Sequence, residues 1–190
     1  KNYPGKIDDL FLECNLSGDK KVNAYNFTRN RGKKVIAQVG IPYELVEKYL
    51  HTSPKRLCKM SEMGLLGSLY GHAFGANAQY ANILTAIFIA TGQDPACVAE
   101  SACGITHVEL GEGKLNVSVT LPGIMIGTIG GGTRLPTQKA CLQILECAGP
   151  GNSIKLAEIV AAATLAGEIS LIGAMAAGEF AMAHSKYGRH

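Results

Sequence analysis

Several patterns that identify common protein classes are absent from this sequence. Its six cysteines contain no CxxC pair, and no histidine stands at metal-ligand spacing from them, so the sequence predicts no metal site. No charged, apolar and small-residue signal peptide opens the chain. An even cysteine count does not by itself indicate a disulfide framework in a chain of 190 residues this apolar. We therefore expect small buried thiols and a reducing compartment, the cytoplasm.

A nucleic-acid reading motif is also missing, although one region of the chain is basic. Residues 1–60 contain 12 Lys and Arg against 6 Asp and Glu, whereas the remaining 130 residues contain 6 against 9. The basic residues are scattered along the first region, which does not favour a nucleic-acid partner. An anionic small molecule, such as a phosphate-bearing cofactor, is equally compatible with this charge and needs fewer assumptions.

Charged residues are few, at 17%, and 47% of the residues are hydrophobic, which is enough to bury the core of one ordinary domain. The most membrane-like stretch, residues 156–182, is interrupted by Glu158, Glu168 and Glu179. Carboxylates at these positions favour a buried protein helix over a membrane span. A membrane anchor upstream of the chain remains compatible with the sequence.

The spacing of apolar residues predicts an α+β fold with a long central helix and a small sheet. We expect strands at residues 34–41, 105–110 and 115–121, the last two forming a hairpin, and a polar loop at 15–21. Helices are expected at residues 43–50, as two consecutive helices within 61–91 separated near 71–78, and at 135–147. Ser153 is expected to cap a final helix of about thirty residues, whose many Ala and Gly residues suit close packing by other helices.

A glycine-rich run, Gly127 to Thr133, follows an expected strand and precedes an expected helix. Backbone N–H groups in this context can bind a phosphate. The run matches neither the dinucleotide-binding G-x-G-x-x-G spacing nor the P-loop. Taken alone it fits a tight structural turn as well as an anion-binding loop.

Three further positions carry polar groups that could do chemistry, and each has a simpler explanation. Lys20, within Asp19-Lys20-Lys21, could stabilise an oxyanion or belong to a solvated charge run. Asp94 could be a functional carboxylate or the N-cap of a helix through Cys103. His184, near the end of the last helix, has the clearest reason of the histidines to be accessible, although Lys186 and Arg189 beside it also fit a simple exposed helix end.

The histidines at 72 and 107 are expected to be packed or half-buried. Local pattern alone does not join Lys20, Asp94 and His184 into one site.

Taken in order, five motifs resemble the 3-hydroxy-3-methylglutaryl-CoA reductases of eukaryotes and archaea, from about residue 12 to residue 189. The motifs are Asp19-Lys20-Lys21, ANAQYANILTAIFIATGQD ending at Asp94, IGTIGGGT at 126–133, LAGEISL at 165–171, and Ala183-His184 with Arg189. The resemblance implies reduction of 3-hydroxy-3-methylglutaryl-CoA to mevalonate and CoA with two hydrides from two NADPH. NADH stays open, because the residues that select the cofactor in this family lie upstream of this chain.

The resemblance also implies roles for the three polar residues. Lys20 would stabilise the oxyanion formed from the thioester carbonyl, and Asp94 would hold that lysine charged. His184 would donate a proton to the departing CoA thiolate, which suits a group whose unperturbed pKa is about 6.5. Lys21 and Asn82 would hold the hydroxymethylglutaryl portion of the substrate.

Ser170 and Leu171 would line the substrate pocket, and Gly130, Gly131, Gly132 and Thr133 would lie near the nicotinamide cofactor. The implied domain organisation has residues 1–11 ending a small ferredoxin-like cofactor-binding domain, 12–23 as a linking loop that carries the lysine, and 24–190 in the large substrate-binding domain. Family members form dimers or larger assemblies with active sites between subunits.

The sequence departs from the family pattern in several places. The family's catalytic glutamate and most of its small domain lie in an upstream segment that this chain lacks. Gln79 stands where many relatives have histidine, Glu13 where a substrate-binding serine is common, and His190 where some relatives have a regulatory serine. We therefore expect an enzyme portion that acts with a missing N-terminal segment. A non-catalytic assembly module, or another protein that binds CoA thioesters or NAD(P), is the alternative.

Overall fold

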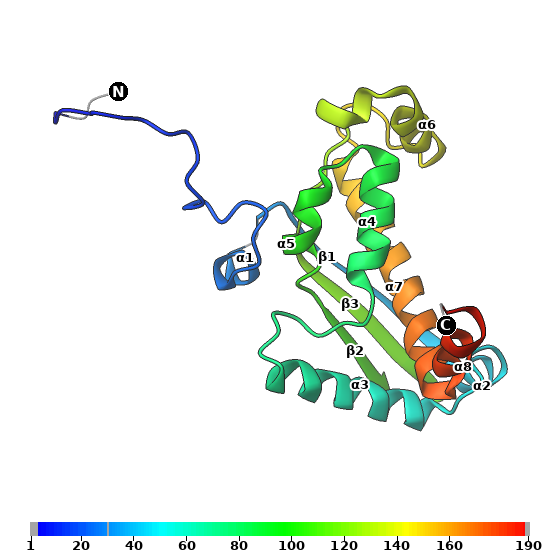
Figure 1. The fold of residues 1–190 in the computed structure, drawn as a ribbon. Helices are drawn as coiled ribbons and strands as arrows, with labels where there is room; N and C mark the ends of the chain where they lie inside the picture. Colours follow the sequence, from blue (N-terminus) through cyan, green and yellow to red (C-terminus); the bar gives the residue numbers. More distant parts are fainter. Residues whose placement is uncertain (1–3, 30, 189–190) are drawn as a thin grey trace.

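The computed structural model describes residues 4–29 and 31–188 and shows a helical layer packed on a three-stranded antiparallel sheet (Figure 1). The strands are β1 (Lys33–Pro42), β2 (Ile105–Leu110) and β3 (Lys114–Ile124), in the order β1-β3-β2. The hairpin of β2 and β3 was predicted, and Val108 lies opposite Val117 in its register. β1 pairs with β3 from far along the sequence, with Ala37 opposite Val119.

Several helices pack against one long helix, which the sequence predicted to be central. The longer helices are α2 (Tyr43–Leu50), α3 (Pro54–Tyr70), α4 (Tyr80–Thr91), α6 (Pro136–Ile144), α7 (Ser153–Ala177) and α8 (Glu179–Tyr187). Short helical turns are α1 (Ala24–Thr28), η1 (Pro95–Cys97), α5 (Val98–Ser101) and η2 (Gly131–Arg134). α7 contacts β1, β3, α3 and α4, so it forms the centre of the fold.

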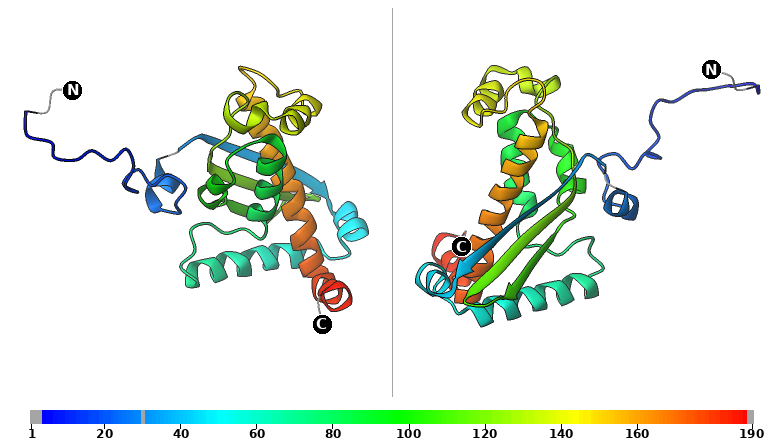
Figure 2. Two further views of the ribbon diagram at one scale, coloured as in Figure 1. Left: turned by 45° about the horizontal axis from the view of Figure 1, so that its top comes forward. Right: turned by 180° about the vertical axis from the view of Figure 1, so that it is seen from behind.

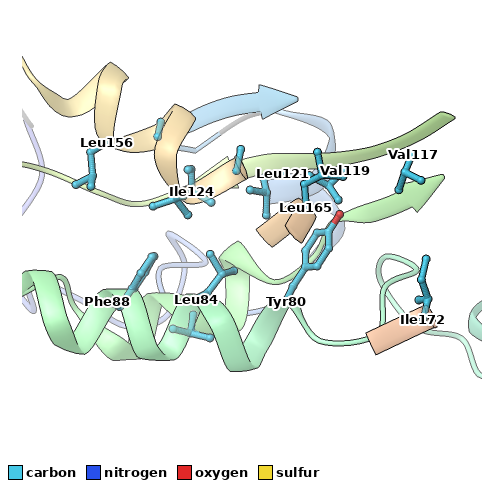
Figure 3. Packing of buried hydrophobic residues seen from close by; sticks show 14 of the residues in the cluster. Tyr80, Leu84, Phe88, Val117, Val119, Leu121, Ile124, Leu156, Leu165 and Ile172 are labelled. Carbon is cyan, nitrogen blue, oxygen red and sulfur yellow. The ribbon is translucent and has the colours of Figure 1, made fainter. Parts of the chain in front are cut away.

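The core lies between α4, α7 and one face of the sheet (Figure 3). Alternate residues of β3 point into it, as the period of two in a strand requires. Residues four apart on α4 meet them from the other side, which is the spacing of one helical face. The labelled core side chains include Tyr80, Leu84 and Phe88 of α4, Val117, Val119, Leu121 and Ile124 of β3, and Leu156, Leu165 and Ile172 of α7.

The opposite face of the sheet carries exposed or half-buried side chains, and Figure 2 (right) shows no helix of the described residues in front of it. His107 lies on this face next to Ser118, and its side chain is exposed. His72 is exposed in the turn after α3. The expectation that these two histidines are packed or half-buried was wrong, because an alternating strand places His107 on the face opposite to buried Val108.

By length and composition alone, α7 could cross a membrane, since it has 25 residues and mean hydropathy 1.8. Its buried residues instead include Glu168, whose carboxylate is fully enclosed, and α7 packs on the sheet. This arrangement agrees with the prediction of a core helix. The predicted single final helix was wrong in one respect: Gly178 adopts a left-handed conformation with φ +81° and separates α7 from α8.

Two smaller predictions were also wrong. Ser153 is the first residue of α7 and makes no capping hydrogen bond, and Asn152 occupies the N-cap position. Cys14 is exposed, although the other five cysteines are buried or half-buried free thiols. Residues 4–17 extend away from the body without a helix or strand (Figure 1), so the proposed end of a ferredoxin-like domain at residues 1–11 stays a prediction.

Candidate active site

The candidate site begins at a tight turn formed by residues 18–21, within the predicted polar loop. Lys21 N–H donates to the carbonyl of Gly18 at 3.2 Å, which closes the turn. Lys20 occupies its third position with φ +60°, in the left-handed region that side chains other than glycine seldom adopt. Asn26, which is buried, donates to the carbonyls of Gly18 and Lys21 and so holds both ends of the turn.

The ammonium of Lys20 lies 2.8 Å from a carboxylate oxygen of Asp94, so the structure brings these two predicted residues together. Both side chains are close to half exposed, at 42% and 47%. The hydrogen bond to Asp94 and its charge raise the pKa of Lys20 above the ordinary value. The hydrogen bond from Lys20 lowers the pKa of Asp94, assisted by a bond from the Ala96 N–H. Both groups are therefore charged over a wide range around neutral pH.

Asp94 is also the N-cap of η1, because its other oxygen accepts the N–H of Ala96 at 3.0 Å. The helix-cap and functional-carboxylate interpretations of this residue are thus compatible. One oxygen fixes the start of the helical segment, and the other faces the lysine. The helix does not run unbroken to Cys103 as predicted, since it consists of η1 followed by α5.

A second carboxylate, Glu100 on α5, lies behind the turn of residues 18–21, called the lysine turn below. Glu100 was not identified from the sequence. Its side chain is 1% exposed. It accepts the backbone N–H of Lys20 at 3.3 Å, the amide of Asn26 at 2.9 Å and the guanidinium of Arg31 at 2.5 Å. Arg31 in turn lies 2.5 Å from Asp19. The turn that presents Lys20 is therefore anchored to α5 by buried charge.

The glycine-rich run lies on the other side of Asp94. An open hollow of about 510 Å³ is bounded by Asp94, Gln93 and the glycines of this run. A Cβ at Gly130 or Gly131 would meet no atom within 4 Å, so their backbone borders open space. Both have positive φ, at +79° and +48°. Bare backbone beside a charged residue fits a ligand-binding loop better than a packed structural turn.

Two contacts fix this loop against the turn that carries Asp94. Gln93 donates to the carbonyl of Gly127 at 2.9 Å and accepts its N–H at 2.8 Å. A Cβ at Gly132 would lie 2.6 Å from the carbonyl oxygen of Gly92, so these two backbones touch. Within the loop, Thr133 Oγ1 donates to the carbonyl of Gly130 at 2.6 Å. The glycine-rich loop is therefore held in a fixed position relative to Asp94.

The expected substrate-pocket residues lie on α4 and α7. Asn82 is exposed in the first turn of α4, Ser170 is exposed on α7, and Leu171 is half-buried beside it. Glu168, one helical turn before Leu171, accepts the N–H groups of Ala78 and Gln79 at 3.0 and 2.6 Å. This buried carboxylate joins the start of α4 to α7 and fixes the relative positions of the two helices. Lys21 is exposed on the turn next to Lys20.

His184 is not brought to Lys20 and Asp94 within residues 4–29 and 31–188. It lies on α8, whose residues are exposed or half-buried, and its ring packs against that of Phe180, with the ring centroids 4.3 Å apart and the planes tilted by 37°. Figures 1 and 2 show α8 at the end of α7 opposite to α6, away from α5. Arg189 of the histidine motif and His190 lie outside the described residues.

Comparison with known proteins identifies relatives of nearly the whole chain. The family described as hydroxymethylglutaryl-coenzyme A reductase matches residues 1–189. The 3-hydroxy-3-methylglutaryl-coenzyme A reductase of Methanocaldococcus jannaschii is 47% identical over 184 residues, covering 96% of this chain and 45% of that protein.

Relatives from other lineages give similar values. The reductase of Pyrococcus abyssi is 48% identical over 187 residues, covering 95% of this chain and 46% of that protein. Reductase 1 of Gossypium hirsutum is 46% identical over 193 residues, covering 96% of this chain and 33% of that protein. The chain thus spans less than half the length of these curated relatives.

Proposed function

The chain belongs to the hydroxymethylglutaryl-coenzyme A reductase family, and on that premise we propose that it is the C-terminal part of an oxidoreductase that converts 3-hydroxy-3-methylglutaryl-CoA to mevalonate and CoA. The observation that carries this proposal is the Lys20–Asp94 ion pair at 2.8 Å beside the hollow bordered by the glycine-rich loop. A cation for a developing oxyanion and a loop for a cofactor are thus adjacent.

Lys20 acts on the oxygen of the thioester carbonyl. As that carbon becomes tetrahedral its oxygen gains negative charge, and an ammonium already fixed beside it stabilises this charge without reorganisation. Asp94 keeps the lysine protonated, because the carboxylate raises the pKa of Lys20. The same pair serves again when the aldehyde is reduced to the alcohol.

Gly130, Gly131, Gly132 and Thr133 would hold a nicotinamide dinucleotide, for which we propose NADPH. Each molecule of this cofactor, when bound, would supply one hydride, so two molecules in succession would supply the two that the reaction needs. The residues fit the group, since the backbone of Gly130 and Gly131 faces open space in which a side chain would occupy the ligand's place. Gln93 fixes the loop next to Asp94, so the loop positions the ligand relative to the lysine.

His184 donates the proton that the CoA thiolate takes up as it leaves. Because α8 lies away from the lysine turn in one chain, we propose that the site is completed between subunits of a homodimer or larger assembly.

Lys21 and Asn82 hold the hydroxymethylglutaryl portion, and Ser170 and Leu171 line its pocket. The family's catalytic glutamate would come from the upstream segment that the relatives carry. We expect the enzyme to act in the cytoplasm.

Reconstitution tests this function directly. The chain is joined to the upstream half that its relatives carry, and loss of NADPH absorbance is followed with 3-hydroxy-3-methylglutaryl-CoA present. We expect substrate-dependent oxidation with release of two NADP⁺ per CoA. NADH in a parallel reaction measures cofactor preference. A folded, complete protein without turnover on either cofactor would contradict the assignment.

A further inference from the structure

The lysine turn has an unusual backbone that needs support. Residues other than glycine at the third position of such a turn, with φ near +60°, are strained by roughly 1 kcal/mol or more and persist only where the surroundings hold them. Lys20 has φ +60°, and the donor that its backbone offers, the N–H, is taken by Glu100 Oε1 at 3.3 Å. Glu100 is therefore placed to stabilise this conformation.

Glu100 and Arg31 together surround the turn. One guanidinium nitrogen of Arg31 lies 2.5 Å from Glu100 and the other 2.5 Å from Asp19, the residue before the lysine. Because the Glu100 side chain is 1% exposed, its charge requires this partner. A guanidinium is planar and offers several donors in fixed directions, so it can bridge two carboxylates in one geometry.

Glu100 and Asp94 belong to the same short helical segment, η1 followed by α5. Asp94 starts the segment and holds the lysine ammonium, whereas Glu100 lies near its end and holds the lysine backbone. The segment thus contacts Lys20 at two points. From this geometry we infer that Glu100 and Arg31 are positioning residues, which lock the turn so that the ammonium of Lys20 meets Asp94.

The inference rests on the catalytic role proposed for Lys20, but its test does not need turnover. Competitive acylation with a limiting amount of acetic anhydride, read by tandem mass spectrometry, gives the labelling ratio of Lys20 to Lys21 in the complete enzyme. Pairing with Asp94 protects the Lys20 amine from acylation, whereas Lys21 has no ion pair among residues 4–29 and 31–188. The neighbouring lysine is therefore an internal standard.

Glu100→Gln keeps the size of the side chain and removes its charge. We expect the labelling ratio of Lys20 to Lys21 to rise by roughly threefold, which is the effect expected when a part-exposed ion pair such as Lys20–Asp94 is lost. Asp94→Asn should raise it by a similar factor. The double variant should equal Asp94→Asn alone, because Glu100 acts on the reactivity of Lys20 only through that pairing. Arg31→Met should resemble Glu100→Gln, with partial recovery in Arg31→Lys.

Two controls separate positioning from general loss of stability. Glu168→Gln alters another fully buried carboxylate that does not contact the lysine turn, and Glu158→Gln alters an exposed one on α7. Both should leave the ratio of Lys20 to Lys21 unchanged. A Glu168→Gln effect equal to that of Glu100→Gln would overturn the inference, since buried charge of any kind would then suffice.

The remaining outcomes are also decisive. An unchanged ratio in folded Glu100→Gln, or additive effects in the double variant with Asp94→Asn, would overturn the positioning role. If the parent enzyme shows no turnover while the ratios follow the expected pattern, the proposed function fails and the positioning of Lys20 stands.

Discussion

The two ends of the molecule hold their expected catalytic groups in different ways. At one end, Lys20 is fixed by Asp94 at its ammonium and by buried Glu100 at its backbone. At the other end, His184 is exposed on α8 and contacts Phe180 of the same helix. A group that must face a developing charge gains from a rigid position. A group that acts in a site shared with another subunit, as we propose for His184, can remain on a helix with few contacts to the rest of its own chain. This difference predicts that substitutions at the two ends change the reaction rates and local stability by unequal amounts.

Replacement of the lysine should have the largest effect. Lys20→Ala removes the proposed oxyanion cation from both reduction steps, and we expect kcat to fall by about 10³-fold with the thioester and with the supplied aldehyde. Steady-state rates of NADPH oxidation with each substrate measure this. Lys55→Ala, at an exposed lysine of α3, is the matched control and should be without effect. Loss confined to the thioester would argue against an oxyanion role in both steps.

Replacement of His184 should slow the two reduction steps by different factors. His184→Gln removes the proposed proton donor for the thiolate, so thioester reduction should slow by about 10²-fold, the lower end for general acid catalysis. Reduction of the supplied aldehyde should be nearly unchanged because no thiolate leaves. The ratio of the two rates is the measurement. Equal losses in both assays would show that His184 acts by some means other than thiolate protonation.

Asp94→Asn tests the charge of Asp94 separately from its cap, since asparagine also caps helices well. Asp94 raises the pKa of Lys20, so its removal lowers that pKa, and the ammonium is lost at a lower pH as pH rises. The alkaline limb of the kcat profile should therefore move to lower pH, whereas the loss of rate through titration at neutral pH should be small. An unmoved alkaline limb would mean that Lys20 does not titrate in that limb.

The sequence predicted the strands well because short runs rich in β-branched residues are a local signal, as in residues 34–41, which form most of β1. Glu100 was missed for a physical reason. Its partners Lys20 and Arg31 lie 80 and 69 positions away, and only folding brings them together. The break at Gly178 was missed because glycine is frequent in that region, and no pattern marks which glycine adopts positive φ.

The smallest effect is expected where α8 joins α7. Gly178 has φ +81° and open space around its Cβ position, so Gly178→Ala adds backbone strain without a clash. About 1 kcal/mol of strain should speed hydrogen exchange of the α8 amides by roughly fivefold. Gly64→Ala is the matched control, because Gly64 lies inside α3 with equal space and helical geometry, where alanine stabilises.

Mass spectrometric exchange in the complete enzyme compares the two glycine variants. Faster exchange confined to α8 in Gly178→Ala, with unchanged exchange in α5, would show that the histidine helix is held separately from the lysine turn. Faster exchange at both ends would show instead that α8 and the Lys20 region open together, and the contrast between the two ends would not hold.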